Sequence, residues 1–177
     1  MSNDIIRIAQ ALDFAAKKHV HQRRKGELKE PYINHLTEVA LLLAEATDGK
    51  DVNLVIAGLL HDTIEDQKVT QEEIAGIFGG DVAVLVSEVT DDKSLLKEER
   101  KRLQVEKAAS KSDRARMLKI ADKIANLGSL LTTPPKDWNS DRLGEYFSWS
   151  KEVVDNCRGV SPVLEKEFDR RWRLGQK

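Results

Sequence analysis

Apolar residues recur at helical spacing along almost the whole chain, and the alternation typical of half-buried strands is nearly absent. The segments 5–16 and 117–131 show this period most clearly, and Pro134-Pro135 is the strongest break between such segments. No internal repeat or linker divides the 177 residues. We therefore predict an all-α fold, with residues 1–177 forming a single bundle of about eight to ten helices.

Sequence signals place the individual helices. The first ends near His19, and the others are predicted at 31–48, 51–65, 70–78, 82–89, 98–109, 112–131, 140–156 and 162–174. The helix over 51–65 is apolar on most sides, which predicts that it lies in the centre of the bundle. Thr70 and Glu73 are spaced as a capping box, and Val69 and Ile74 as a hydrophobic staple.

Composition excludes several classes of protein. The 29 Lys and Arg residues balance 30 Asp and Glu, which excludes a globally basic nucleic-acid binder. The single cysteine, Cys157, excludes a disulfide framework and a cysteine-based zinc site within one chain. The apolar runs are too short to span a bilayer, and no secretory signal is recognisable. We expect a cytoplasmic protein with no nucleic-acid or membrane partner.

The stretch His61-Asp62-Thr63-Ile64-Glu65-Asp66 has four side chains that could bind a metal or accept a proton. On a continuous helix His61 shares a face with Glu65, and Asp62 shares one with Asp66. One imidazole and three carboxylates this close repel one another unless a cation lies among them. A solvated acidic helix end is the alternative, although acidic groups at a helix C-terminus oppose the dipole.

Two further residues stand out because their surroundings are unusual. Asp122 lies in a helix whose flanking positions are apolar, and Asn126 is one turn further along the same face. A salt bridge to Lys123 or to another basic residue is the alternative role for Asp122. His35 follows Tyr32 at a predicted helix start, where a lone histidine is more often structural than a ligand.

In order along the chain, His35, His61-Asp62 and Asp122 resemble the H…HD…D pattern of the HD-domain metal-dependent phosphohydrolases. The segments around them resemble the hydrolase domain of the RelA/SpoT family: 23–26, 31–35, 59–66, 88–93 and 121–127. The segments 98–106 and 145–147 narrow the resemblance to its stand-alone members, the small alarmone hydrolases, which include the metazoan SpoT homologues. It extends from about residue 4 to residue 160, so a single HD domain without synthetase, TGS or ACT regions is expected.

The resemblance implies one Mn²⁺ per chain, held by His35, His61, Asp62 and Asp122. Two imidazoles, two carboxylates and no sulfur independently suit a borderline-hard ion with positions open to water. By the same resemblance, Glu65 and Asp66 orient or deprotonate the attacking water. Their presence argues against a degenerate domain that only binds a nucleotide. A purely structural bundle would leave the four convergent ligands without a purpose.

The implied reaction is hydrolysis of guanosine 3′,5′-bis(diphosphate), or of the pentaphosphate, at the ribose 3′ position, which releases pyrophosphate and GDP or GTP. Expected substrate contacts are Arg24, Lys25, Tyr32, Asn126, Lys97, Arg142 and Tyr146. The planar guanidinium of Arg24 is suited to stacking on a base. Removal of the NADPH 2′-phosphate and hydrolysis of adenosine-type alarmones remain alternatives, as do a monomer and a homodimer.

The sequence departs from the family pattern at two positions. Leu36 stands where the family usually has proline, which we expect to soften the metal site without removing a ligand. Ala125 replaces a larger, often aromatic residue before Asn126, which we expect to widen the nucleoside pocket.

Overall fold

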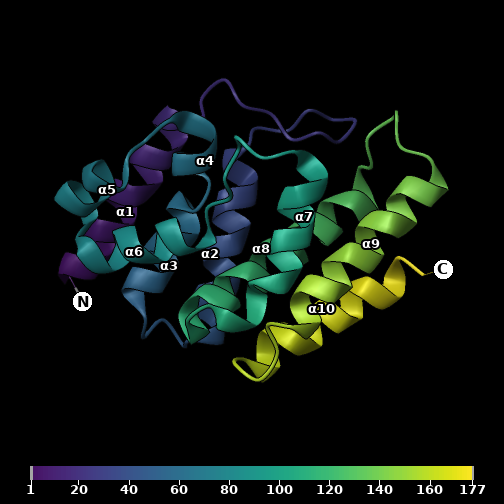
Figure 1. The fold of residues 1–177 in the computed structure, drawn as a ribbon. Coiled ribbons are helices and arrows are strands. Elements are labelled where there is room, and N and C mark those ends of the chain that lie inside the picture. Colours follow the sequence, from purple (N-terminus) through teal and green to yellow (C-terminus); the bar gives the residue numbers. More distant parts are fainter. Residues whose placement is uncertain (1, 177) are drawn as a thin grey trace.

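The computed structural model describes residues 2–176, which form ten α-helices and one short 3₁₀-helix (Figure 1). The elements are α1 (Ser2–Lys18), α2 (Ile33–Ala46), α3 (Val52–Leu60), α4 (Thr63–Gln67), α5 (Gln71–Phe78), α6 (Gly80–Val89), α7 (Lys97–Glu106), η1 (Ala108–Ser110), α8 (Asp113–Thr132), α9 (Ser140–Asp155) and α10 (Pro162–Leu174). This architecture confirms the predicted all-α fold. None of these helices is both long and apolar enough to cross a membrane.

Helix α3 lies at the centre of the bundle, as predicted from its apolar sequence. It packs against α1, α2, α6 and α8, and every residue from 54 to 60 is buried. Gly58 allows α2 to approach closely, because a Cβ there would lie 2.8 Å from Leu43 Cδ1 and 3.2 Å from Ala40 Cα. The close packing of α2 and α3 brings together the helix ends that carry the two candidate histidine ligands.

The single helix predicted over 51–65 is wrong, because the chain bends at His61-Asp62 between α3 and α4. Asp62 leaves helical geometry, with φ −98° and ψ 0°, and becomes the residue that precedes α4. The buried hydroxyl of Thr63 donates to the Leu60 carbonyl at 2.6 Å and satisfies the end of α3. The Asp66 amide still donates to the Asp62 carbonyl at 2.8 Å, so Asp66 remains one turn beyond Asp62, and both side chains line the same cleft.

The start of α5 follows its sequence signals closely. The Thr70 side chain accepts a hydrogen bond from the Glu73 amide at 3.1 Å, which is one of the two hydrogen bonds of the predicted capping box. The returning hydrogen bond, from the Thr70 amide to the Glu73 carboxylate, is not made among the described residues. The Glu73 carboxylate contacts Lys18 of α1 at 2.9 Å, so it ties α5 to a neighbouring helix. Val69 and Ile74 are both buried at the positions predicted for the staple.

The connection between α1 and α2 lies at the same end of the bundle as α4 and the start of α7 (Figure 1). Two backbone hydrogen bonds close it into a compact loop, from Arg24 N to Glu30 O at 2.9 Å and from Tyr32 N to Gln22 O at 3.1 Å. Gly26 rests on the end of α8, where a Cβ would lie 2.3 Å from the carbonyl oxygen of Thr133. The loop therefore holds its basic residues in place beside α8.

Helix α10 packs against α8 and also contacts α2. Arg171 donates to Glu38 Oε1 of α2 at 2.7 Å and lies directly over Gly128 of α8. A Cβ at Gly128 would lie 2.0 Å from the Arg171 guanidinium. This contact joins α2 and α8, which carry His35 and Asp122.

Candidate metal centre and active-site cleft

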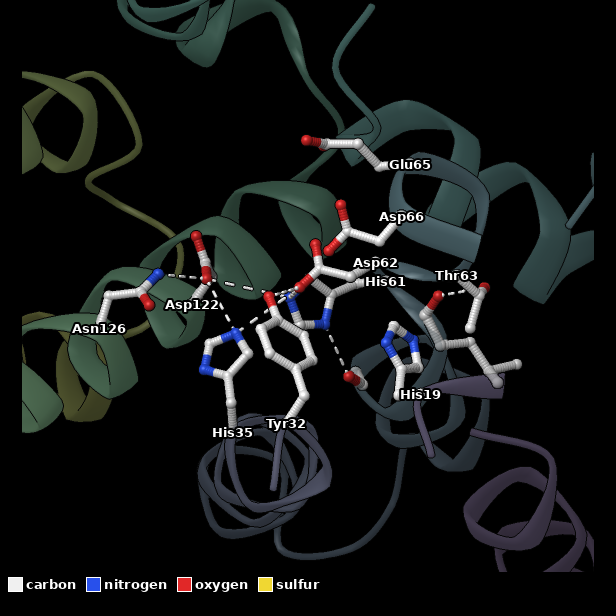
Figure 2. A network of polar contacts seen from close by, with 12 residues as sticks. His19, Tyr32, His35, His61, Asp62, Thr63, Glu65, Asp66, Asp122 and Asn126 are labelled. Carbon is white, nitrogen blue, oxygen red and sulfur yellow. Dashed lines mark hydrogen bonds and ion pairs between the residues drawn. The ribbon is translucent and has the colours of Figure 1, made fainter. Parts of the chain in front are cut away.

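The four predicted metal ligands converge from three parts of the fold (Figure 2). His35 lies in the first turn of α2, His61 and Asp62 form the bend between α3 and α4, and Asp122 lies in α8. One ligand atom each from His35, His61 and Asp62 lies within 4.8 Å of the others. Asp122 Oδ1 lies 3.3 Å from His35 Nε2 and 3.9 Å from His61 Nε2.

The orientation of the His61 ring is set by the backbone. Its Nδ1 lies 2.8 Å from the carbonyl oxygen of Gly58, which can only accept, so Nδ1 carries the donated proton. Its Nε2 lies 3.1 Å from Asp62 Oδ2, yet it is buried and makes no hydrogen bond within the described part of the chain. A histidine tied to a carbonyl through one nitrogen, with the other facing carboxylates, is typical of a metal ligand.

The carboxylates shape the charge of this centre. Burial lowers the pKa of His61, but the charges of Asp62 and Asp122 outweigh burial and raise it to about 9. Burial raises the pKa of Asp122, but Lys123 and His35 outweigh it and hold that pKa well below its usual range. Both carboxylates face the imidazoles in their ionised form. The donor set therefore fits a divalent metal ion, whose binding would displace the proton that the carboxylates favour on His61.

Three other side chains hydrogen-bond to the two candidate carboxylate ligands. The Tyr32 hydroxyl donates to Asp62 Oδ2 at 2.6 Å, and Asn126 Nδ2 donates to Asp122 Oδ1 at 2.7 Å. Lys123 Nζ donates to the second oxygen of Asp122 at 3.1 Å. The salt bridge considered as an alternative for Asp122 therefore exists, and it coexists with the position of Asp122 beside the two histidines.

Glu65 lies on α4 beside this centre, on the same side as Asp66 (Figure 2). Its Oε2 accepts the backbone amide of Asp91 at 3.2 Å, and its Oε1 lies 3.8 Å from Arg100. Burial, followed by the charges of Asp62 and Asp91, raises the pKa of Glu65. A carboxylate whose pKa is raised toward neutrality is suited to accepting a proton.

Asp66 follows Glu65 and faces a different set of partners. Its Oδ2 accepts from Gln22 Nε2 at 2.7 Å, and its Oδ1 accepts from Lys93 Nζ. Sequence reasoning placed Asp66 beside Asp62 on one helix face. The hydrogen bond from Gln22 in addition ties Asp66 to the loop between α1 and α2.

A cleft of about 570 Å³ opens beside the acidic residues. It is lined by all seven predicted substrate contacts: Arg24, Lys25, Tyr32, Lys97, Asn126, Arg142 and Tyr146. The predicted residues Glu65 and Asp66 line it as well, together with Asp62. Its walls also carry four basic residues outside that set: Arg23, Lys93, Arg100 and Lys101.

An aromatic group forms the part of the cleft wall that comes from α9 and the segment before it. The Tyr146 ring lies 5.6 Å from that of Trp138 and 5.3 Å from that of Trp149, and Arg142 lies 4.6 Å over Trp138. Sequence reasoning missed both tryptophans. The available signal was the three-residue spacing of Tyr146 and Trp149, which places two aromatic rings on one face of α9.

The two departures from the family pattern both lie in the core. Leu36 is fully buried at the start of α2, directly after His35. Ala125 is also fully buried, so it faces the core and does not line the cleft. The expectation that Ala125 widens the nucleoside pocket is therefore wrong.

Comparisons with known proteins agree with this geometry. Residues 11–143 match the HD domain family. Guanosine-3′,5′-bis(diphosphate) 3′-pyrophosphohydrolase MESH1 of Xenopus tropicalis is 48% identical over 96% of this chain and 94% of its own length. The human enzyme of the same name is 45% identical over 94% of this chain and 93% of its own.

A solved structure described by the words "A metazoan ortholog of SpoT hydrolyzes ppGpp and plays a role in starvation responses" superposes with a TM-score of 0.90. It is 45% identical, and the match covers 94% of both chains. The family match, the animal relatives and this structural likeness extend over the same helices that hold the acidic centre and the cleft. The chain therefore belongs to the HD-domain family and, within it, to the RelA/SpoT-related hydrolases that include these animal enzymes.

Proposed function

We propose that this protein hydrolyses guanosine 3′,5′-bis(diphosphate), and the corresponding pentaphosphate, at the ribose 3′ position. Water adds to the phosphorus next to the 3′ oxygen, and the bond between that phosphorus and the oxygen breaks. The 3′ oxygen leaves with a proton, so the products are pyrophosphate and GDP or GTP. The MESH1 relatives, whose names state this activity, support the proposal over nearly the full chain.

The observation that carries the proposal is the separation of charge within one site. The candidate ligands and Glu65-Asp66 form an acidic centre, and the adjoining cleft is rich in arginine and lysine. A nucleotide with two diphosphates needs cations along its length and a reactive centre at one phosphorus. Arg24 and Lys25 on one loop, with Lys97 and Arg142 on other elements, line this cleft, and we expect them to bind those phosphates.

We assign the metal to His35, His61, Asp62 and Asp122, and we expect Mn²⁺ because nitrogen and carboxylate oxygen ligands suit it. When bound, a divalent ion polarises phosphate oxygens and lowers the pKa of water. Tyr32 and Asn126 hold the two carboxylates in the orientation that such a site requires.

The remaining steps belong to side chains of the cleft. Glu65 accepts the proton of the attacking water, since burial and neighbouring carboxylates raise its pKa. Asp66, which lies on the same side of α4 and lines the same cleft, orients that water. The aromatic group of Trp138, Tyr146 and Trp149 gives the nucleoside a surface on which to pack.

The test is pyrophosphate release from the purified protein, with the guanosine substrate and Mn²⁺. We expect turnover that is lost on chelation and restored by added Mn²⁺. No release, with Mn²⁺ binding demonstrated by calorimetry, would contradict the proposal. Values of kcat/KM for the guanosine alarmone, its adenosine counterpart and NADPH would then rank the substrates, because specificity is a ratio of these values.

A further inference from the structure

A buried histidine outside the metal centre has no role in the mechanism above. His19 follows the end of α1, and its side chain is almost completely buried. Its ring stacks on Tyr32, with centroids 5.3 Å apart and planes 18° apart, and its Nδ1 lies 2.7 Å from Gln22 Oε1. Figure 2 shows His19 on the far side of His61 from Asp122.

The amide of Gln22 links this histidine to Asp66. Gln22 Nε2 donates to Asp66 Oδ2 at 2.7 Å, and a carboxylate accepts but does not donate when it is ionised. The other end of the amide, Oε1, accepts from Gln67 Nε2 and faces His19 Nδ1. Gln67 Nε2 also lies 3.2 Å from His19 Nδ1, but Gln22 Oε1 is nearer, and because Oε1 is an acceptor, His19 donates to it from Nδ1. Burial lowers the pKa of His19, which favours the neutral ring with a single proton.

We infer that His19 and Gln22 are positioning residues that hold the Asp66 carboxylate in its working orientation. His19 and Gln67 hold the Gln22 amide, and the Gln22 amide holds Oδ2 of Asp66. The other Asp66 oxygen is held by Lys93, a half-exposed side chain on a loop. Without Gln22, Asp66 is free to turn toward Lys93. This inference rests on the proposed function, because it assigns a role within the same reaction.

The first test is Gln22→Leu, which keeps a similar volume and removes the donor to Asp66. We expect kcat to fall by on the order of 10- to 100-fold, the range for lost supporting hydrogen bonds, with KM changed less than about twofold. Mn²⁺ affinity stays at the wild-type value, since Gln22 contacts none of the four candidate ligands. Gln71→Leu, at an exposed glutamine at the start of α5, is the matched control and keeps wild-type kinetics.

A double-mutant cycle separates positioning from a general structural effect. If Gln22 acts through Asp66, Gln22→Leu adds little to the loss already caused by Asp66→Asn, because coupled residues are not additive. If Gln22 only supports the local fold, the two losses multiply. Multiplied losses would overturn the inference.

Two substitutions at His19 test the hydrogen bond separately and do not depend on the folding of the Gln22 variant. His19→Asn keeps a donor near the position of Nδ1 and loses the ring, whereas His19→Phe keeps the stacked ring and loses the donor. We expect His19→Phe to lower kcat as Gln22→Leu does, and His19→Asn to retain more activity. The reverse order would show that the stack on Tyr32 is what matters. Inactive wild-type protein would contradict the proposed function, whereas active wild-type with fully active Gln22→Leu would overturn only this inference.

Discussion

The hydroxyl of Tyr32 donates a 2.6 Å hydrogen bond to Oδ2 of Asp62, a candidate metal ligand. The same ring stacks on His19 and meets His35 edge-on at 5.4 Å. Arg24 lies 5.7 Å from the ring centre. The sequence analysis predicted that Tyr32 contacts the substrate, whereas its hydroxyl hydrogen-bonds to a candidate metal ligand.

Tyr32→Phe therefore removes one hydrogen bond and leaves the stacked ring in place. We expect Mn²⁺ affinity and kcat to fall by on the order of 10- to 100-fold, as for other outer-shell partners of metal ligands. Burial, together with the charge of Asp62, raises the pKa of Tyr32, so the hydroxyl stays a donor across the range of the assay. Calorimetric titration with Mn²⁺ and steady-state kinetics measure the effect. A change in KM alone, with normal Mn²⁺ affinity, would show that Tyr32 serves to contact the nucleoside and does not support the metal centre.

Asp62→Ala should abolish turnover, and it should also remove the stabilisation of the folded protein by Mn²⁺. An ion that binds only the folded state stabilises it by about 2.7 kcal/mol at one hundred times its dissociation constant. We expect a rise in Tm for the wild type on adding Mn²⁺ and almost none for Asp62→Ala. Asp48→Ala, at an exposed carboxylate paired with Lys50, serves as the control and should respond as the wild type does. Turnover near the wild-type rate in Asp62→Ala would contradict the ligand assignment.

Most of the fold was predictable because its helices carry their own signals. The segment from Val69 to Gly79 has its buried staple, its cap and its glycine stop within eleven residues of sequence. The bend at His61-Asp62 was not predictable from periodicity, since the residues on both sides of it favour helix. It is set by tertiary contacts of Asp62 with Tyr32 and with the histidines.

The candidate site could be predicted from the sequence about as well as the fold. Residues such as Asp122 were found because a carboxylate among apolar neighbours is unusual in a helix. Gln22 was missed because a single glutamine in a polar loop has no sequence signature. Arg100 and Lys101 lie in a strongly charged segment that carries no motif of its own, and in the fold, where α7 packs against α9, they line the cleft.

Glu65→Gln should raise the stability of the metal-free protein while it lowers activity. Burial, then Asp62 and Asp91, raises the pKa of Glu65 above its ordinary 4.5, so the folded state binds this proton more tightly than the unfolded chain does. Stability therefore falls as pH rises from about 4.5 through the raised pKa, and the full loss is present above it.

Thermal unfolding in the presence of a chelator tests this expectation. At pH 8 we expect a higher Tm for Glu65→Gln than for the wild type, and the difference should vanish near pH 4, where Glu65 is protonated in both states. Glu152→Gln, at an exposed position of α9, should show no such dependence on pH. Equal melting temperatures for wild type and Glu65→Gln at pH 8 would contradict the raised pKa.

Gly58→Ala should disturb the metal centre through the packing of two helices. The added Cβ would lie 2.8 Å from Leu43 Cδ1 and 3.2 Å from Ala40 Cα, so α2 must move away from α3. We expect a loss of roughly 1–3 kcal/mol in the free energy of unfolding, the range for overpacked cores. Mn²⁺ affinity should fall as well, because His35 is carried by α2 and the Gly58 carbonyl orients His61.

Gly76→Ala is the matched control, since a Cβ at this position of α5 meets nothing within 4 Å. Alanine within a helix is more favourable than glycine by about 0.5–1 kcal/mol, so Gly76→Ala should stabilise the protein and leave Mn²⁺ affinity unchanged. Urea unfolding gives the stability of both variants, and calorimetry gives their Mn²⁺ affinity. If Gly58→Ala lost stability but bound Mn²⁺ as the wild type does, the close packing of α2 on α3 would not be what places His35 opposite His61.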